Sequence, residues 1–273
     1  MNKLTFGILG DGFIAPRHKE AIDKIGGDLI WICDKDVCKI QKDGKWTATT
    51  KKDYLDMVLP DYVAVCTPNN THNDYINYFA SMGCKVLTEK PPVLKSDQIE
   101  RFGKYIPVYV VLQLHYHPEV IKMKQKLNPF EKHKGYIMVK VKRDPAYWNS
   151  WKGKDEESGG ILFNLGIHYI ELLMHLFGNE VKIVTEKIYK DKKKSAGVLD
   201  FDGNEFCYYF EIMDTDDGQD RKLVIDGEEI SLSKKDNLSF EDLHTKVYEE
   251  MVAGHGIHIQ ECYNVIKLIE KLS

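Results

Sequence analysis

The fold is decided by the stretch Leu4-Thr5-Phe6-Gly7-Ile8-Leu9-Gly10-Asp11-Gly12-Phe13-Ile14-Ala15, where an apolar run leads into the pattern G-x-G-x-x-A. The run predicts a buried strand, and the pattern predicts a tight turn into a helix that cradles a dinucleotide. Gly10 permits the turn, Gly12 lets backbone N–H groups approach a pyrophosphate, and the helix starting near Ile14 adds the positive end of its dipole. We therefore expect four turn residues to bind the cofactor: Gly10, Gly12, Phe13 and Ile14.

An acidic residue, Asp34, ends the next apolar run, residues 29–33. A carboxylate in this position accepts hydrogen bonds from the adenosine ribose and disfavours the 2′-phosphate of NADP. The turn and Asp34 together predict a domain that binds NAD. Two alternatives stay open: a glycine turn in another kind of α/β protein and, because Lys35 follows Asp34, binding of NADP.

The composition is typical of a water-soluble protein. The chain has 273 residues, 43% hydrophobic and 29% charged, with a formal net charge of −4. We expect no nucleic-acid partner because the chain lacks a sustained basic stripe. We expect no membrane partner because no apolar stretch approaches the roughly 18 residues of a membrane span. The six cysteines lack C-x-x-C spacing and several lie in apolar runs, so we expect reduced thiols and a cytoplasmic location.

Short apolar runs alternate with amphipathic segments up to about residue 112, which predicts a parallel, doubly wound sheet. The polar stretch 35–50 is too short for a crossover helix plus a strand, so we expect the sheet to be trimmed there. The strands are expected at residues 4–9, 29–33, 62–66, 85–88 and 108–112, and the helices near 14–24, 51–57, 72–82 and 96–103.

The pattern changes after about residue 128. Residues 136–142 alternate with period two, which predicts a half-buried antiparallel strand. A long helix is expected over about 160–176, two Asp-Gly pairs predict hairpins, and helices at 241–253 and 259–271 close the chain. Further strands are expected at 181–188, 196–201, 205–212, 221–225 and 228–232. The fold class is therefore α/β, with an N-terminal Rossmann-type domain (1–114) and a C-terminal α+β domain with a mostly antiparallel sheet (115–273).

Two polar motifs directly follow strands of the predicted parallel sheet, where ligands of such sheets bind. In the first, Cys66-Thr67-Pro68-Asn69-Asn70-Thr71-His72, we expect cofactor contacts from Thr67, Asn69 and His72. A Pro-Asn turn capped by Thr71 or Asn70 is the alternative.

The second motif is Glu89-Lys90-Pro91-Pro92, in which one X-Pro bond could be cis. We expect Glu89 and Lys90 beside the cofactor. The Lys90 ammonium could polarise a substrate hydroxyl and then stabilise the ketone oxygen that forms. A surface Glu-Lys pair is the alternative.

The long helix of the second half carries Asn164 and His168, four residues apart and so on one face. An Asn can orient a sugar hydroxyl while a His takes its proton. A core histidine, or a metal site formed by His168, Glu171 and His175, is the alternative, but no zinc-type spacing appears and we expect no metal. Lys152 lies in an aromatic stretch and could neutralise a carboxylate or phosphate.

Gln113 leaves the last strand of the first half and is expected to line the substrate site. His115 and His117 follow it as an H-x-H pair that could instead bind metal. We expect four substrate-binding residues: Gln113, Lys152, Asn164 and His168.

Taken in order, five motifs resemble the Gfo/Idh/MocA oxidoreductases: G-x-G-x-x-A, the acid after the second strand, C-T-P-N-x-x-H, E-K-P and G-G-x-x-x-N-x-G-x-H. Other stretches are similar to one branch, the UDP-2-acetamido-2-deoxyglucuronate 3-dehydrogenases that serve bacterial surface polysaccharide synthesis. The resemblance implies NAD as oxidant, the C3 hydroxyl of a UDP-linked sugar as the reacting group, and Lys90 and His168 as catalytic residues. It also implies NADH recycling by 2-oxoglutarate in some members, and a homo-oligomer (dimer or tetramer) formed through the second domain.

Two features depart from that branch. The chain is shorter between Asp34 and Tyr62, which puts cofactor affinity in question, and His115 stands where the branch carries Arg. We expect an NAD-dependent dehydrogenase for a UDP-linked N-acetylhexosaminuronate. The alternatives are another sugar or inositol dehydrogenase of the same family, or a non-catalytic dinucleotide-binding protein.

Overall fold

The computed structural model describes residues 3–35, 37–42, 45–50, 58–102, 107–188, 193–216, 218–232 and 240–273. The chain forms two compact units. The first comprises Met1–Val93, Asp97–Gln113 and Phe240–Glu261, and the second comprises Leu94–Ser96, Leu114–Ser239 and Cys262–Ser273. These units differ from the continuous ranges 1–114 and 115–273, because α8 (Phe240–Val252) packs in the first unit. There the Tyr248 hydroxyl lies 2.8 Å from Nδ1 of His18 on α1 (Ala15–Lys24).

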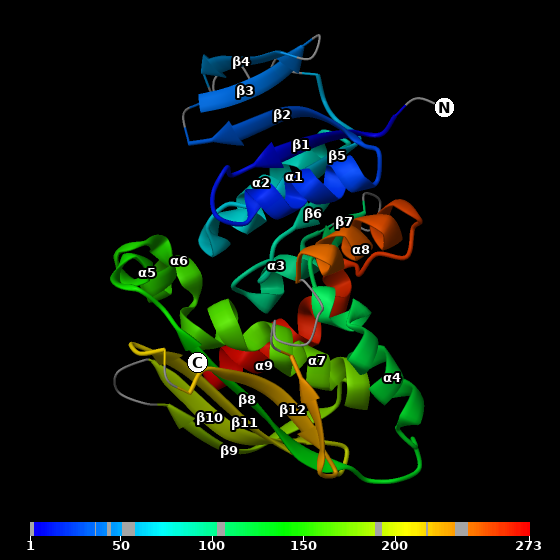
Figure 1. Cartoon of the computed structure of the whole chain (residues 1–273), viewed down its shortest axis with the longest axis vertical. Coiled ribbons are helices and arrows are strands. Elements are labelled where there is room, and N and C mark those ends of the chain that lie inside the picture. The colour runs from blue at the N-terminus through cyan, green and yellow to red at the C-terminus, as the bar shows by residue number, and fades with distance from the viewer. Residues whose placement is uncertain are drawn as a thin grey trace. The chain divides into compact units, whose positions relative to one another are not determined.

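The first unit contains a seven-stranded sheet in the order β4-β3-β2-β1-β5-β6-β7 (Figure 1). Strands β2, β1, β5, β6 and β7 run parallel, as in a Rossmann-type sheet. Every residue of β5 is buried, as in a strand that is covered on both faces. The expected fold class is confirmed for this half of the chain. The elements are β1 (Thr5–Leu9), β2 (Asp28–Asp34), β5 (Tyr62–Val65), β6 (Lys85–Thr88), β7 (Val108–Val110), α2 (His72–Ser81) and α3 (Ser96–Glu100).

The sheet is extended after Asp34, and the expectation of a trimmed sheet was wrong. Strands β3 (Val37–Lys42) and β4 (Lys45–Thr50) add to its edge as an antiparallel hairpin. The backbone of Lys35 has a positive φ of 46° in the turn between β2 and β3. A short polar stretch can therefore add two strands without a crossover helix. The helix expected at 51–57 lies outside the described residues.

The hairpin also brings two cysteines together. Cys33 on β2 and Cys38 on β3 are direct register partners, with Cα atoms 4.0 Å apart, and form a disulfide. The expectation of six reduced thiols was wrong for this pair, because it depended on sequence spacing without the antiparallel pairing. The free cysteines in the described part of the chain are Cys66, Cys84, Cys207 and Cys262.

The second unit contains a six-stranded sheet in the order β13-β12-β8-β11-β10-β9 (Figure 1). Its pairs are antiparallel except for β8 with β11, so the strand expected to be antiparallel is parallel to one neighbour. Both Asp-Gly hairpins are confirmed, since the residues at 202–203 and 226–227 have positive φ as this turn type requires. The strands are β8 (Lys134–Lys142), β9 (Val181–Ile188), β10 (Lys194–Phe201), β11 (Asn204–Met213), β12 (Asp220–Ile225) and β13 (Glu228–Ser231).

Helices of the second unit lie along one face of this sheet (Figure 1). The helical stretch Asp155–Phe177 has 23 residues and is long and apolar enough to cross a membrane, so the expectation that no such stretch exists was wrong. Its most apolar window is 56% buried within the structure, as in the core helix of a globular domain. The helices are α4 (Pro118–Lys126), α5 (Pro145–Asn149), α6 (Asp155–Ser158), a π-helical turn η5 (Leu162–Gly166), α7 (Ile167–Phe177) and α9 (Tyr263–Leu272).

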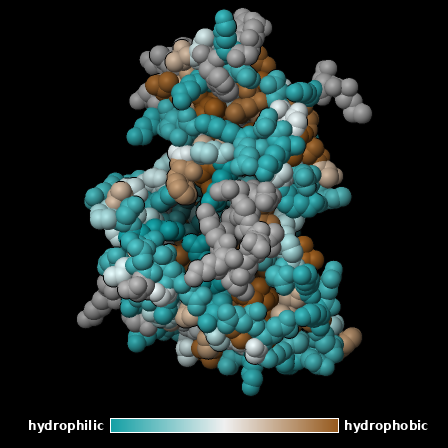
Figure 2. Space-filling model, in the orientation of Figure 1, coloured by the Kyte–Doolittle hydropathy of each residue, from teal (hydrophilic) through white to brown (hydrophobic). Residues whose placement is uncertain are grey.

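The face of the molecule in Figure 2 is mostly hydrophilic. Large apolar side chains that are exposed lie at scattered positions of the chain, among them Phe13, Val58 and Phe130. Single exposed apolar residues are normal in soluble proteins. Most large apolar side chains of the described residues are therefore buried in the cores of the two units.

Candidate active site

The glycine turn has the backbone that a dinucleotide requires. Gly10 has a φ of +97°, and a Cβ there would lie 2.7 Å from the Cys66 carbonyl oxygen, so only glycine fits. A Cβ on Gly12 would meet no atom within 4 Å, so the space beside it is open for a phosphate. Phe13 is 80% exposed, and Ile14 directly precedes α1. The turn therefore fits the pyrophosphate of a dinucleotide at the start of a helix.

Asp34 lies at the end of β2, where its carboxylate oxygen Oδ2 accepts a hydrogen bond of 3.1 Å from the Asp11 N–H. The Asp11 side chain in turn binds Lys19 and Lys39 at 2.5 and 3.0 Å. Burial raises the pKa of Asp11, but the hydrogen bonds from the two lysines outweigh it and lower this pKa overall. The carboxylates of Asp11 and Asp34 can therefore both lie beside the glycine turn, because the two lysines neutralise the charge of Asp11. The position of Asp34 fits an adenosine ribose.

The loop after β5 leads to His72, one of the residues that were predicted to contact the cofactor. His72 is fully buried, with Nδ1 2.7 Å from the Pro91 carbonyl oxygen and Nε2 2.8 Å from that of Thr67. Both ring nitrogens face backbone carbonyl oxygens, so the ring ties two loops together. Asn69 is buried, whereas Thr67 is partly exposed and its hydroxyl lies 2.7 Å from that of Thr71.

Glu89 and Lys90 follow β6 at the carboxyl edge of the same sheet. The Glu89 oxygen Oε1 lies 3.0 Å from Nε2 of His18 and 3.4 Å from Nε2 of His244. Burial raises the pKa of Glu89, but hydrogen bonds from the two histidines outweigh it and hold this pKa well below its usual range. The alternative of a surface Glu-Lys pair is therefore wrong, because Glu89 is bound by buried rings.

The backbone of the Glu89-Lys90-Pro91 motif also makes specific contacts. The Lys90 N–H donates to Glu89 Oε2 at 3.3 Å, and the Lys90–Pro91 bond is cis, which confirms the expected isomer. The side chain of Lys90 is partly exposed. His18 and His244 lie in stretches that are similar to the branch of UDP-sugar dehydrogenases, but their contacts with Glu89 could not be predicted, because they depend on the packing of α1 and α8.

In the second unit, Asn164 and His168 share the accessible side of their helix. Of residues 162–174, these two alone are partly exposed, and the others are buried. The Asn164 amide donates to the Tyr147 hydroxyl at 2.7 Å and to the Lys152 carbonyl oxygen at 3.4 Å. The helix therefore presents an amide and an imidazole from one surface, the arrangement that a sugar hydroxyl would need.

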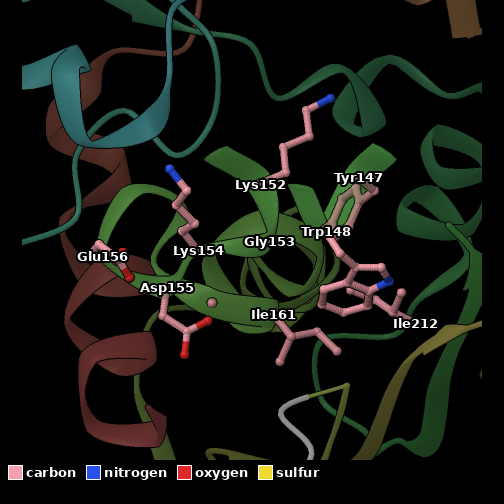
Figure 3. Close-up of a pocket in the computed structure, with 10 residues that line it drawn as sticks. Tyr147, Trp148, Lys152, Gly153, Lys154, Asp155, Glu156, Ile161 and Ile212 are labelled. Carbon is pink, nitrogen blue, oxygen red and sulfur yellow. The ribbon is translucent and has the colours of Figure 1, made fainter. Parts of the chain in front are cut away.

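A pocket of about 380 Å³ adjoins this surface in the second unit (Figure 3). The wall of the pocket includes Tyr147, which binds Asn164, and Trp148. It also includes Lys152, which was predicted to bind the substrate. Figure 3 shows the ammonium groups of Lys152 and Lys154 on one side of the pocket and the Asp155 carboxylate on the other. The pocket offers an aromatic wall and charges of both signs, because Lys152 and Lys154 line it together with Asp155 and Glu156.

Gln113 belongs to the first unit, where it begins the short helix η3 (Gln113–Tyr116). Its side chain is 7% exposed, and its amide oxygen has no hydrogen-bond partner among the described residues. A buried acceptor without a partner is uncommon and marks a place where a donor is expected.

The metal alternatives find little support. Glu171 lies 2.6 Å from His115 Nε2, and His175 lies 3.0 Å from the Lys124 ammonium. Within the described ranges, the one group of side chains compact enough for a metal is His18, Glu89 and His244. The set His168, Glu171 and His175 is therefore not a metal site in this structure.

The histidine pair of the second unit predicts an acid-sensitive fold. The rings of His115 and His175 lie in contact with centroids 3.7 Å apart, tilted by 33°, and burial, then His115 and Lys124, lower the pKa of His175 from 6.5 to about 3. As pH falls below 6.5, His175 is protonated in the unfolded chain but stays neutral in the folded chain. The free energy of unfolding therefore decreases. At pH 5 we expect a loss of about 2 kcal/mol from this group.

Urea unfolding of the wild type and of His175→Phe at pH 7 and pH 5 measures this loss. The Phe ring keeps the ring contact with His115 but does not titrate. We expect the wild type to lose about 2 kcal/mol more than the variant between the two pH values. Equal losses would contradict the prediction.

Two family models match the chain. Residues 4–107 match the Gfo/Idh/MocA model described as "Oxidoreductase family, NAD-binding Rossmann fold". Residues 129–261 match the companion model, "Oxidoreductase family, C-terminal alpha/beta domain". The chain belongs to the Gfo/Idh/MocA oxidoreductase family. The resemblance drawn from the motifs is confirmed, and so is an NAD-binding Rossmann domain in this member of the Gfo/Idh/MocA family.

Relatives within the family act on sugars or inositol. The chain is 26% identical over 196 residues to D-glucoside 3-dehydrogenase of Escherichia coli (strain K12), covering 64% of this chain and 54% of that protein. It is 25% identical over 193 residues to inositol 2-dehydrogenase of Rhizobium meliloti (strain 1021), covering 67% and 57%. The matches thus span little more than half the length of these relatives.

Solved structures match over a larger part of the chain. The WlbA (WbpB) dehydrogenase from Thermus thermophilus, in complex with NAD and UDP-GlcNAcA, is 27% identical with a TM-score of 0.82. That match covers 97% of this chain and 92% of the other. The same dehydrogenase in complex with NAD and alpha-ketoglutarate matches with 26% identity and a TM-score of 0.82, covering 96% and 92%.

Proposed function

We propose that this protein is an NAD-dependent dehydrogenase that oxidises the C3 hydroxyl of a UDP-linked N-acetylhexosaminuronate. The observation that carries the proposal is Lys90, whose N–H donates to the partly buried Glu89 at the same carboxyl edge of the sheet as the glycine turn and Asp34. The likeness to the Thermus thermophilus dehydrogenase, which was solved with NAD and UDP-GlcNAcA, supports the choice of substrate.

The chain's own residues divide between holding the ligands and moving a proton. The glycine turn, Asp34, Thr67, Asn69 and Glu89 hold the cofactor, and bound NAD supplies the hydride acceptor. Lys90 hydrogen-bonds the reacting sugar oxygen and stabilises it as it becomes a ketone oxygen.

A second set of residues binds and deprotonates the sugar. His168 takes the hydroxyl proton, while Asn164 and Gln113 fix the sugar. Lys152, at the pocket of the second unit, neutralises a carboxylate or a phosphate of the substrate.

The wider setting is also a proposal. We infer that the protein acts in the cytoplasm in the synthesis of nucleotide sugars for bacterial surface polysaccharides, and that 2-oxoglutarate re-oxidises its NADH. The complex of the Thermus thermophilus dehydrogenase with NAD and alpha-ketoglutarate supports the second point. We infer a homo-oligomer, a dimer or tetramer, formed through the second unit.

A substrate panel tests the function. The purified protein is assayed for NAD and NADP reduction with UDP-N-acetylglucosaminuronate, UDP-N-acetylglucosamine, a free glucoside and myo-inositol, each with and without 2-oxoglutarate. We expect turnover with NAD and UDP-N-acetylglucosaminuronate, and little with NADP because Asp34 repels a 2′-phosphate.

Two other outcomes define the alternatives. Turnover that ignores the uridine diphosphate would favour a free-sugar or inositol dehydrogenase, the activities named for the curated relatives. Failure to bind NAD in calorimetry would favour a non-catalytic protein.

A further inference from the structure

A buried hydrogen-bonded network lies behind Lys90 in the first unit. It joins His18 on α1, Glu89 after β6, and His244 and Tyr248 on α8. The two histidines are at most 1% exposed. Burying an ionised carboxylate is costly unless hydrogen bonds compensate it, so the rings are what allow Glu89 to stay charged there.

The protons of the network can be assigned. Burial lowers the pKa of His18 despite the neighbouring Glu89, and burial raises the pKa of Tyr248 well above its usual value. A neutral His18 that donates Nε2–H to Glu89 must accept at Nδ1, where the Tyr248 hydroxyl lies 2.8 Å away and donates. Each polar atom of the Tyr248–His18–Glu89 chain then has a matching partner, and the chain is rigid.

The network acts on one side of Lys90, and a third histidine acts on the other. Glu89 is fixed at Oε1 by His18 and His244, and its Oε2 accepts the Lys90 N–H at 3.3 Å. Beyond Lys90, the Pro91 carbonyl oxygen lies 2.7 Å from His72 Nδ1. Both residues that flank Lys90 in the chain are thus tied to buried imidazoles.

We propose that His18 and His244 are positioning residues, which hold Glu89 and through it fix the backbone from which Lys90 reaches its substrate. The proposal rests on the proposed function, because it concerns the lysine assigned there as catalytic. A displacement of about 1 Å in a reacting group can cost about 100-fold in rate, so a rigid support of this kind has a measurable effect.

A hydrogen-bonded network describes these side chains better than a metal site does. The nearest atoms of Glu89 and His18 lie 3.0 Å apart, a hydrogen-bond distance, and the second nitrogen of His18 is already matched by Tyr248. Three ligand atoms are close enough together to hold zinc, however, so the metal content of the wild type belongs in the test.

Leucine and glutamine variants separate positioning from mere packing. His18→Leu and His244→Leu remove the donor to Glu89, whereas His18→Gln and His244→Gln offer an amide N–H at similar reach. We expect the leucine variants to lose about 100-fold in kcat with the KM for the sugar changed by less than about threefold, and the glutamine variants to recover most of the loss. His133→Leu is the matched control, since buried His133 also binds a carboxylate, Asp226, at 2.7 Å, but in the second unit. It should lower Tm and leave kcat unchanged.

A second readout does not depend on turnover. Brief acetylation with acetic anhydride, followed by mass spectrometry, gives the reactivity of Lys90 relative to exposed Lys122. We expect this ratio to change at least about threefold in the leucine variants and to stay constant in His133→Leu.

The outcomes are distinct. A folded His18→Leu protein with wild-type kcat and Lys90 reactivity would overturn the proposal, as would stoichiometric zinc that is lost in this variant. A wild type without turnover on any sugar would instead contradict the proposed function, and the Lys90 reactivity would still test the positioning role.

Discussion

Replacing Lys90 with alanine is expected to lower kcat by about 1,000-fold, because the ketone oxygen that forms would lose its charged hydrogen-bond donor. NAD affinity should change by less than about tenfold, since the glycine turn and Asp34 carry most of the cofactor contacts. Steady-state kinetics with UDP-N-acetylglucosaminuronate gives the first value, and calorimetry with NAD gives the second.

Two further substitutions sharpen this prediction. Lys90→Arg keeps the positive charge but carries it on a planar fork, so we expect recovery of only a small part of the activity. Lys95→Ala is the control: this exposed lysine lies in the same loop, and its ammonium is 4.0 Å from Glu270. Wild-type turnover in Lys90→Ala would remove this residue from the mechanism.

Features that depend on local chemistry could be predicted from the sequence. The glycine turn has the positive φ at Gly10 that its pattern requires, and both Asp-Gly pairs form the expected hairpins. The parallel and antiparallel strands were found because each has its own hydrophobic period. Lys90 could be located because a residue that follows a strand of a parallel sheet must lie at the carboxyl edge.

Features that depend on how strands pair and how helices pack could not be predicted. The Cys33–Cys38 disulfide depends on the antiparallel pairing of β2 and β3. The polar stretch after Asp34 does not predict this pairing. The burial of His72 depends on the Pro91 carbonyl, and the binding of Glu89 depends on α8, whose place in the first unit is a matter of packing. The residue type limits which interactions a side chain can make, and the packing around it determines which of them it makes.

Replacing His168 with alanine is the second prediction with a large effect. We expect kcat to fall by about 1,000-fold at pH 7, because the sugar hydroxyl would lose its general base. Asn164, the other partly exposed residue of this helix surface, would still bind the sugar, so KM should change by less than about tenfold. His175→Phe is the control, because His175 lies on the same helix but binds Lys124.

The pH dependence of this variant separates a base from a core histidine. Without a general base, the hydroxyl must lose its proton to hydroxide, so the rate of His168→Ala should rise about tenfold per pH unit between pH 7 and 9. The wild type should change much less over this range, since an imidazole is already neutral there. A histidine that only packs the helix would give the opposite result: a lower Tm in the alanine variant, with a pH–rate profile parallel to that of the wild type. Parallel profiles in a folded variant would therefore exclude His168 as the base, and Lys90 would then have to be tested for that role as well.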